Sequence, residues 1–212
     1  MHHNIVFCNT RAGFDQDIDR NGAPNNFFYN NTSYGNSRNG ILLDVGGAPP
    51  IVAAVVLNNL LASNGLGGPY APKNDYGASR VNAIDVSDYN FIADGAFPRD
   101  STQQEPLLEG PHSLIVDGTP GDPLFIDAYI KDWSTGVISN SQGALDTSWQ
   151  GTLVATMDNI RSQVERAFAL QTLAEGFAED SPCLNAGVEI PSVTTGFSGP
   201  APDIGAVETP EP

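Results

Sequence analysis

Two neighbouring stretches decide the fold: Ala12-Gly-Phe-Asp-Gln-Asp-Ile-Asp-Arg-Asn-Gly22 and Phe27-Phe-Tyr-Asn-Asn-Thr-Ser-Tyr-Gly-Asn36. The first has carboxylates at every second position, and the second is an aromatic run that ends in paired asparagines. Twelve of the 18 asparagines of the chain lie before residue 65. Asn tolerates the left-handed backbone of tight bends, and stacked Asn amides can hydrogen-bond between layers ~4.8 Å apart. We therefore expect an asparagine ladder at the corners of stacked coils.

A loose repeat supports this interpretation. Three short β-prone runs, each carrying asparagine near its end, can be stacked on one another: residues 4–10, 26–32 and 54–60. Aligning Asn9, Asn31 and Asn59 gives spacings of 22 and 28 residues, within the range of repeat architectures. Apolar runs at 12–14 and 40–43 would form a second strand in each turn. The pattern predicts an all-β parallel solenoid rather than a sandwich of hairpins.

The region before the tail has a different period. Apolar residues recur every three or four positions on one face of an expected helix at about 153–175: Leu153, Met157, Ile160, Val164 and Phe168. Gly176 is placed to end this amphipathic α-helix. We expect one domain over 1–212, with coils at 1–127, an insertion containing the helix at 128–180, and closing strands at 181–212.

Composition limits the partners. The formal net charge is −16, from 25 acidic and 9 basic residues, which argues against nucleic acid because phosphate binding needs clustered Lys and Arg. The same charge would repel an acidic polysaccharide unless a cation such as Ca²⁺ bridges the two. The most apolar run, 51–57, is far shorter than the ~20 residues of a membrane span, so we expect no membrane insertion.

The two ends of the chain carry two further expectations. No secretory signal is visible, and the strand expected at 5–7 begins with an open edge that invites self-association. This start suggests a truncated gene or a fragment of a longer protein. Cys8 and Cys183 lie at opposite ends, and the sequence favours two small buried apolar residues over a disulfide.

Four oxygen-bearing side chains in the first stretch suggest a metal site. Asp15, Asp17, Asp19 and Asn21 alternate before Gly22, and alternating oxygens in a loop can converge on Ca²⁺, which takes six to eight ligands with loose geometry. A solvated acidic turn is the alternative. His112 lies beside Pro111 in an expected loop, and no His/Cys cluster has zinc spacing.

Candidate catalytic groups are few. Abstraction of a proton next to a carboxyl group would need a base, and the candidates near the coils are Arg11, Lys73 and Arg80. A glycoside hydrolase would instead use two carboxylates about 5 to 9.5 Å apart, which Asp15, Asp17 or Asp44 could supply.

Two motifs resemble known families. The run Gly13-Phe-Asp-Gln16, followed by Tyr29-Asn-Asn-Thr-Ser-Tyr34, resembles the polysaccharide lyases of family 9, which are pectate-lyase-like right-handed parallel β-helices. The tail, Ser181-Pro-Cys-Leu-Asn-Ala-Gly187 with Asp203-Ile-Gly-Ala-Val-Glu208, resembles the closing segment of many secreted β-helix proteins, as does Asp122-Pro-Leu-Phe-Ile-Asp127. Together these segments cover about half of the chain.

The resemblance implies an extracellular or cell-surface protein that acts on an acidic polysaccharide by β-elimination with Ca²⁺. Candidate substrate-binding residues are Asp15, Gln16, Tyr34 and Arg38. The lysine base and calcium-binding aspartates of the family normally precede the Gly-Phe-Asp-Gln run, and no residue here matches the motif around that lysine. The chain would then be a C-terminal part that lacks the base. The alternatives are a non-catalytic polysaccharide-binding or surface-stalk β-helix and, third, a glycoside hydrolase with paired aspartates.

Overall fold

The computed structural model describes residues 1–18, 26–45, 54–65, 76–78, 84–93, 109–115, 130–132, 134–140, 143–144 and 177–209. This part of the chain is all-β, with fourteen strands and no helix. The helix predicted at 153–175 lies outside the described residues, so that prediction is not tested.

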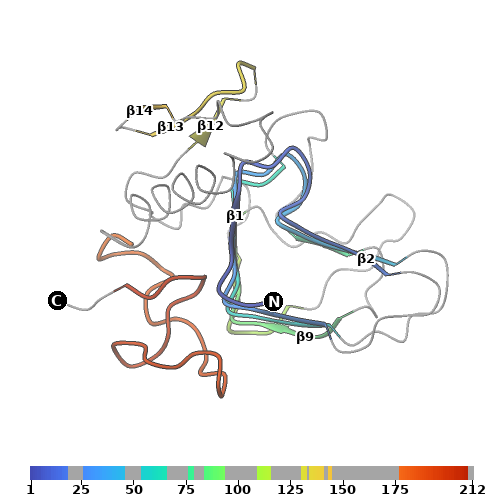
Figure 1. Ribbon diagram of the computed structural model, residues 1–212. Helices are drawn as coiled ribbons and strands as arrows, with labels where there is room; N and C mark the ends of the chain where they lie inside the picture. Colours follow the sequence, from blue (N-terminus) through green and yellow to red (C-terminus); the bar gives the residue numbers. More distant parts are fainter. Residues whose placement is uncertain are drawn as a thin grey trace, which may run out of the picture.

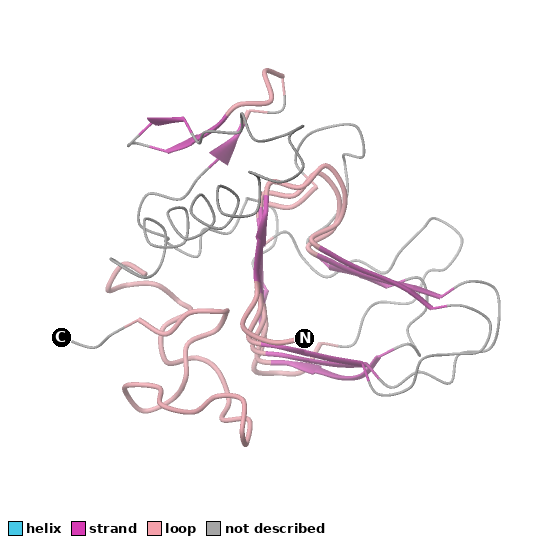
Figure 2. Ribbon diagram, in the orientation of Figure 1, coloured by secondary structure: helices cyan, strands magenta, loops and turns pink. Residues whose placement is uncertain are grey.

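The first ten strands follow one another through three parallel sheets in rotation, and the eleventh joins the same sheet as the tenth (Figures 1 and 2). One sheet contains β2 (Phe14–Ile18), β5 (Ile41–Val45) and β8 (Tyr76–Ala78), and another contains β3 (Asn26–Tyr29), β6 (Ala54–Leu57) and β9 (Ile84–Asp88). The third, five-stranded sheet has the order β1 (Ile5–Phe7), β4 (Thr32–Tyr34), β7 (Leu60–Ala62), β10 (Phe91–Ile92) and β11 (Leu114–Ile115). The strands predicted at 12–14 and 40–43 pair in this arrangement, with Phe14 opposite Ile41.

A separate small sheet is antiparallel. It consists of β12 (Ile130–Lys131), β13 (Ile138–Asn140) and β14 (Gly143–Ala144). Between β12 and β13, the exposed carboxylate of Asp132 accepts hydrogen bonds from Ser134 and Thr135 and fixes the turn. These bonds, first from Ser134 and then from Thr135, lower the pKa of Asp132 to about 2.

The repeating element is a seven-residue segment that we call the corner module. Its three complete copies are residues 3–9, 30–36 and 58–64. Each copy has a residue of positive φ, an asparagine, three strand residues, a second residue of positive φ and a second asparagine. The first positive-φ position is occupied in turn by His3, Asn30, Asn58 and, in an incomplete fourth copy, Tyr89.

The asparagines of the corner module form two ladders. In the first, the side-chain oxygens of Asn31, Asn59 and Asn90 each accept from the asparagine of the preceding layer, at separations of 27, 28 and 31 residues. In the second, Asn36 accepts from the backbone of Asn9 and donates to Asn64. The expected ladder is present, but the predicted alignment of Asn9 with Asn31 was wrong by five positions. Asn9 belongs to the second asparagine of the module and Asn31 to the first.

Apolar side chains fill the space between the parallel sheets. The interior cluster contains the buried side chains of Phe14, Phe28, Ile41, Ala54, Val56, Leu61 and Ile92. Period-two alternation along the short strands sends their neighbours to the other side of the five-stranded sheet. There, a second cluster joins Leu60, Ala62, Phe91 and Ala93 to Phe177, Cys183 and Ile204.

The segment 177–209, which we call the C-terminal cover, supplies the outer half of this second cluster. It lies on the outer side of the stack labelled β1 in Figure 1. Asn58 docks it with two side-chain hydrogen bonds to the backbone of Val188, and the backbone oxygen of Asn58 accepts from Gly205. The closing strands predicted within 181–212 are not found in 181–209, which forms turns. These turns cover a flank of the sheet instead of extending its edge.

Both cysteines are free and buried, as the sequence favoured. Cys183 lies inside the second cluster, where burial raises the pKa of its thiol. Cys8 occupies a positive-φ position of the first corner module.

Candidate functional site

The predicted calcium ligands lie in and after β2. Asp15 is exposed, and its Cα is opposite Leu42 of β5. Gln16 and Asp17 belong to the same strand, but the structure does not describe their side chains. Asp19 and Asn21 lie outside the described residues. The backbone register places Asp17 directly beside Asp44 of β5. The calcium site at these residues stays a prediction.

The structure describes two of the basic candidates, Arg11 and Arg38. Arg11 and Arg38 lie at the same corner of successive layers, where the backbone N–H of Arg38 donates to the carbonyl of Arg11 at 3.3 Å. Arg11 is exposed and Arg38 is partly buried. Lys73 and Arg80 lie outside the described residues. Tyr34 packs against the second apolar cluster beneath the C-terminal cover, away from the Asp15 strand.

A cavity lies between the first corner modules and the C-terminal cover. Its volume is about 320 Å³, within the usual size range of small-molecule sites. His3 and Asn30 form one wall, and the cover forms the other with residues that include Thr195, Phe197 and Glu208. Sequence reasoning did not place a site here, because the cavity joins segments almost 200 residues apart.

The geometry of the two walls follows from local structure. His3 and Asn30 occupy equivalent positive-φ positions of successive modules, with φ of 52° and 48°, and both therefore reach the same wall. On the other side, Gly205 has a φ of 118° and brings the cover within hydrogen-bonding distance of Asn58 and Thr32. An added Cβ at Gly205 would lie 2.9 Å from the hydroxyl of Thr32, so the close approach requires glycine.

Two ionisable side chains lie among the described residues of the cavity wall, His3 and Glu208. Desolvation of the His3 ring and, second, the neighbouring His2 lower the pKa of His3, so its imidazole is predominantly neutral at neutral pH. The Nδ1 atoms of the two histidines are 3.0 Å apart. Glu208 accepts a hydrogen bond from the backbone N–H of Asp203 at 3.1 Å. The cavity wall therefore contains one carboxylate and one imidazole among both polar and apolar residues, including the ring of Phe197.

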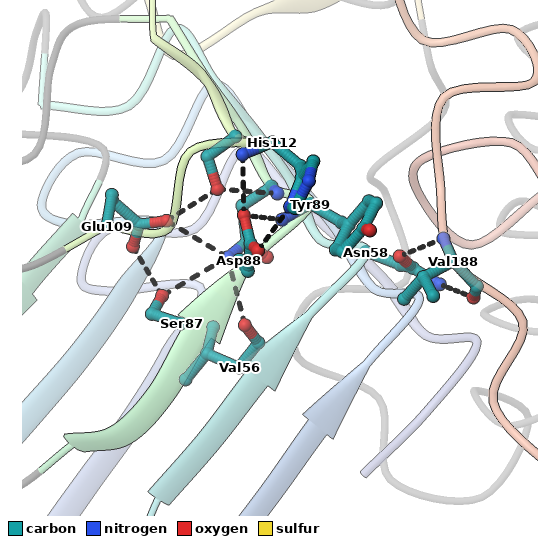
Figure 3. A network of polar contacts seen from close by, with 10 residues as sticks. Val56, Asn58, Ser87, Asp88, Tyr89, Glu109, His112 and Val188 are labelled. Carbon is teal, nitrogen blue, oxygen red and sulfur yellow. Dashed lines mark hydrogen bonds and ion pairs between the residues drawn. The ribbon is translucent and has the colours of Figure 1, made fainter.

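A second polar cluster lies at the end of β9 and was not predicted from the sequence (Figure 3). Asp88 accepts two backbone hydrogen bonds, from Tyr89 and His112, and its second oxygen lies 2.7 Å from the Nδ1 of His112. The His112 and Tyr89 rings stack with centroids 4.5 Å apart. Burial of Asp88 opposes ionisation, but the hydrogen bonds from His112 and the two backbone N–H groups outweigh it and lower the pKa of Asp88.

Glu109 closes the first asparagine ladder beside this cluster. The backbone N–H of Asn90 donates to the hydroxyl of Ser113, which takes the place of a further asparagine, and Ser113 donates to Glu109. Glu109 also accepts from Ser87 and, at 3.4 Å, from the amide of Asn90. Burial raises the pKa of Glu109 despite these bonds, and the nearby Asp88 adds to the shift. Both oxygens of Glu109 accept hydrogen bonds from Ser87, Asn90 or Ser113. This carboxyl group therefore ends the ladder and is not a free catalytic acid.

One sequence pattern could have indicated both the cavity and the Asp88 cluster. The corner module repeats as His-Asn, Asn-Asn, Asn-Asn and Tyr-Asn at residues 3–4, 30–31, 58–59 and 89–90. The copies that depart from Asn-Asn, at His3 and Tyr89, are those at the cavity and at the Asp88 cluster. An alignment on these pairs would have singled them out.

Two features are absent from the residues that the structure describes. Within those ranges, no three His, Cys, Asp or Glu side chains converge in a way that would hold a metal ion. Nor does the described part of the chain contain a helix of the length and apolarity that a membrane crossing needs. Comparison of the chain with protein-family models, with curated proteins and with solved structures finds no match to any of them.

Proposed function

We propose that the three parallel sheets form a right-handed parallel β-helix and that the protein is a carbohydrate-binding member of this architecture. Rotation of the chain through three sheets at separations of 27, 28 and 31 residues supports the architecture. Architecture alone does not fix an activity, so the function has to rest on a site.

The cavity of about 320 Å³ carries the functional proposal. A sugar ring presents an apolar face and a belt of hydroxyl groups. Phe197 offers an aromatic surface for the face, while Asn30 and Thr195 offer hydrogen-bonding groups for the belt. The resemblance to uronate lyases would make the ligand an acidic polysaccharide that is bound outside the cell, with Ca²⁺ offsetting the charge of the protein.

Binding without cleavage is the form of this function that we put first. Arg11 and Arg38 lie at a different corner from the cavity, and the lysine motif of the resembling lyases has no counterpart in the chain. A lyase reaction at Arg11, Lys73 or Arg80 would generate an unsaturated uronate, which absorbs ultraviolet light. Incubation with polygalacturonate and Ca²⁺ across a range of pH therefore separates the two forms, because binding alone yields no absorbing product.

The binding proposal is tested by calorimetric titration with uronate and neutral oligosaccharides, with and without Ca²⁺. We expect Phe197→Ala and Thr195→Val to weaken binding at least about tenfold, a change of about 1.4 kcal/mol. Phe27→Ala is the matched control, because Phe27 is an exposed aromatic residue that does not line the cavity. Equal weakening by Phe27→Ala, or no binding of any saccharide, would contradict the proposal.

Glycoside hydrolysis is a second candidate, and the register of β2 and β5 favours it. Asp17 and Asp44 are direct neighbours on adjacent parallel strands, which lie ~4.8 Å apart. Retaining glycosidases hold their two carboxyl groups about 5 Å apart. We expect Asp17→Asn and Asp44→Asn each to abolish release of reducing sugar. Glu189→Gln, at an exposed position of the C-terminal cover, is the control. Hydrolysis that survives both substitutions would exclude the pair.

A further inference from the structure

We infer that His2 and His3 together form a two-imidazole site for a divalent transition-metal ion such as Zn²⁺, beside the cavity. Binding of the ion is independent of the proposed function. The role that we assign to the ion, which is to hold the carboxylate of an acidic saccharide, rests on that function. Imidazole nitrogens suit Zn²⁺, Cu²⁺ and Ni²⁺, whereas Ca²⁺ takes oxygen ligands.

The first step is the distance between the two rings. Their Nδ1 atoms lie 3.0 Å apart, and the ring planes are nearly perpendicular, at 88°. Two imidazoles that bind one zinc ion at about 2.0–2.1 Å have their nitrogens about 2.8 to 3.4 Å apart, for angles at the metal between about 90° and 109°. The observed separation lies within this range, so the two nitrogens can reach one ion without a rearrangement of the backbone.

The second step is the backbone that brings the rings together. Successive side chains of an extended strand point to opposite sides, but His3 has a φ of 52°, which is uncommon for a residue other than glycine. The backbone N–H of His3 donates to the carbonyl of Asn30 at 3.0 Å, and the side-chain amide of Asn4 donates to the carbonyl of His2 at 3.0 Å. These contacts involve neither ring. They hold the pair in place, which reduces the conformational entropy lost when both rings bind one ion.

The third step is the place of the pair beside the cavity. His3 lines the cavity, so an ion on its ring would lie close to a ligand bound there. Two imidazoles fill two of the four positions that Zn²⁺ commonly uses, and the other positions are open to water or to a ligand. The carboxylate of a uronate would supply an anionic oxygen for one of them. The ion would also offset part of the formal net charge of −16, which repels such a ligand.

The test is calorimetric titration of the whole chain with Zn²⁺, with Ca²⁺ as the control ion that prefers oxygen ligands. We expect His2→Ala and His3→Asn each to weaken Zn²⁺ binding at least about tenfold. The double variant should lose little more, since the two rings act as a unit. His3→Asn should retain the fold, because Asn occupies the equivalent positive-φ positions at residues 30 and 58. Ca²⁺ binding should be the same in all of these variants.

His112→Ala is the matched control for the metal site. It removes the third histidine of the chain, whose ring contacts Asp88 and does not line the cavity, so Zn²⁺ binding should persist. In NMR spectra of the wild type, Zn²⁺ should shift the ring signals of His2 and His3 and leave those of His112 in place. No Zn²⁺ binding, binding that survives in His2→Ala and His3→Asn, or equal loss in His112→Ala overturns the metal site but leaves saccharide binding standing.

A second titration measures galacturonate trimers with and without Zn²⁺. We expect Zn²⁺ to tighten their binding at least about tenfold in the wild type and to have no such effect in His2→Ala. Zn²⁺ that binds at the two histidines without changing the affinity for galacturonate overturns the role of the ion in holding the saccharide. If no saccharide binds under any condition while Zn²⁺ still binds at His2 and His3, the proposed function is wrong and the metal site stands.

Discussion

The side-chain oxygen of Asn59 accepts two hydrogen bonds from Asn31, one from the backbone N–H at 3.1 Å and one from the side-chain amide at 2.9 Å. The amide nitrogen of Asn59 donates in turn to the carbonyl groups of Phe28 and Leu57. Both asparagines are fully buried. One side chain therefore satisfies polar groups of two layers at a point that water does not reach.

We expect Asn59→Ala to lower the free energy of unfolding by about 2–4 kcal/mol, because each buried group left without a partner costs roughly 1–3 kcal/mol. Urea denaturation measures the loss. Asn9→Ala is the control from the end of the second ladder, where the exposed Asn9 makes its ladder contact through the backbone. A comparable loss in Asn9→Ala would show that the lost stability comes from the conformational preference of asparagine at a corner and not from the ladder contacts.

A second prediction concerns the docking of the C-terminal cover. In Gly205→Ala the new Cβ would lie 2.9 Å from the Thr32 hydroxyl and 3.3 Å from the Cβ of Leu60, on a backbone with a φ of 118°. We expect the cover to loosen and the buried Cys183 to react with a thiol reagent at least about tenfold faster, since 1.4 kcal/mol of local opening is a factor of ten. Peptide mass spectrometry distinguishes Cys183 from Cys8.

Gly196→Ala is the matched control for that substitution. Gly196 also has a positive φ, 80°, and lies in the same cover, but an added Cβ would meet nothing within 4 Å. It should therefore destabilise only through backbone strain, roughly 1 kcal/mol. Unchanged reactivity of Cys183 in Gly205→Ala would show that the cover does not depend on this close approach.

The pH dependence of stability should carry the signature of Glu109. Its folded-state pKa is raised above the ordinary value of 4.5, chiefly by burial. Its contribution to stability is therefore fully present below pH 4.5 and is lost as the pH rises through the raised value. The contribution of Asp88 depends on pH in the opposite direction. Its pKa is lowered from 3.8, so its contribution to stability is lost only as the pH falls below that value.

We expect Glu109→Gln to remove the loss at higher pH, since Gln has no ionising proton. Its carbonyl oxygen can still accept from Ser113, and its amide nitrogen can donate to the Ser87 hydroxyl in place of the acceptor that is lost. Thermal unfolding of wild type and Glu109→Gln, followed from pH 4 to 9, should show curves that diverge as the pH rises. Glu109→Ala should lose about 1–3 kcal/mol at every pH, because the ladder end is left without acceptors. Parallel curves for wild type and Glu109→Gln would refute the assignment.

The fourth prediction concerns Tyr89. This residue has a φ of 54°, a conformation that is costly for an aromatic residue by roughly 1–3 kcal/mol. The equivalent residues Asn30 and Asn58 tolerate it better. We expect Tyr89→Asn to be as stable as the wild type or more stable by about 1 kcal/mol in urea denaturation. Tyr89→Phe keeps the strain and the ring beside His112, and should therefore not gain stability. A less stable Tyr89→Asn would instead indicate that the ring stack with His112 outweighs the backbone strain.

The all-β class and the ladder could be predicted because strand propensity and the preference of Asn for left-handed bends are local properties. The alignment of Asn9 with Asn31 was wrong because both asparagines of the corner module share the same local preference for tight bends. Only the pairing between layers distinguishes Asn9 from Asn31. The packing of the C-terminal tail was harder to predict than the ladder. Cys183 and Ile204 are apolar residues, and the docking of the tail, not their own backbone conformation, determines which face of the sheet they contact.

The candidate site shows the same limit more strongly. Sequence patterns drew attention to the alternating carboxylates of β2, because charged residues at regular spacing are visible without a structure. The cavity instead joins His3 to Glu208, and its walls come from opposite ends of the chain. No local period relates two such residues. The Asp88 cluster was missed for a related reason, because His112 acquires its partner only through the return of the chain beside β10.

The corner module also determines which changes of chain length the fold can accept. The amide contacts join residues at fixed places within the seven-residue copies, whereas the separations between copies vary from 27 to 28 to 31. Insertions between copies can therefore accumulate without disturbing the stack, but a single residue added within one copy would misplace an asparagine. Removal of residues 31–58 would join Asn30 to Asn59 and delete one complete layer. Such a protein would lack one complete coil. Each remaining asparagine amide of the ladder would still pair with an asparagine of the neighbouring coil.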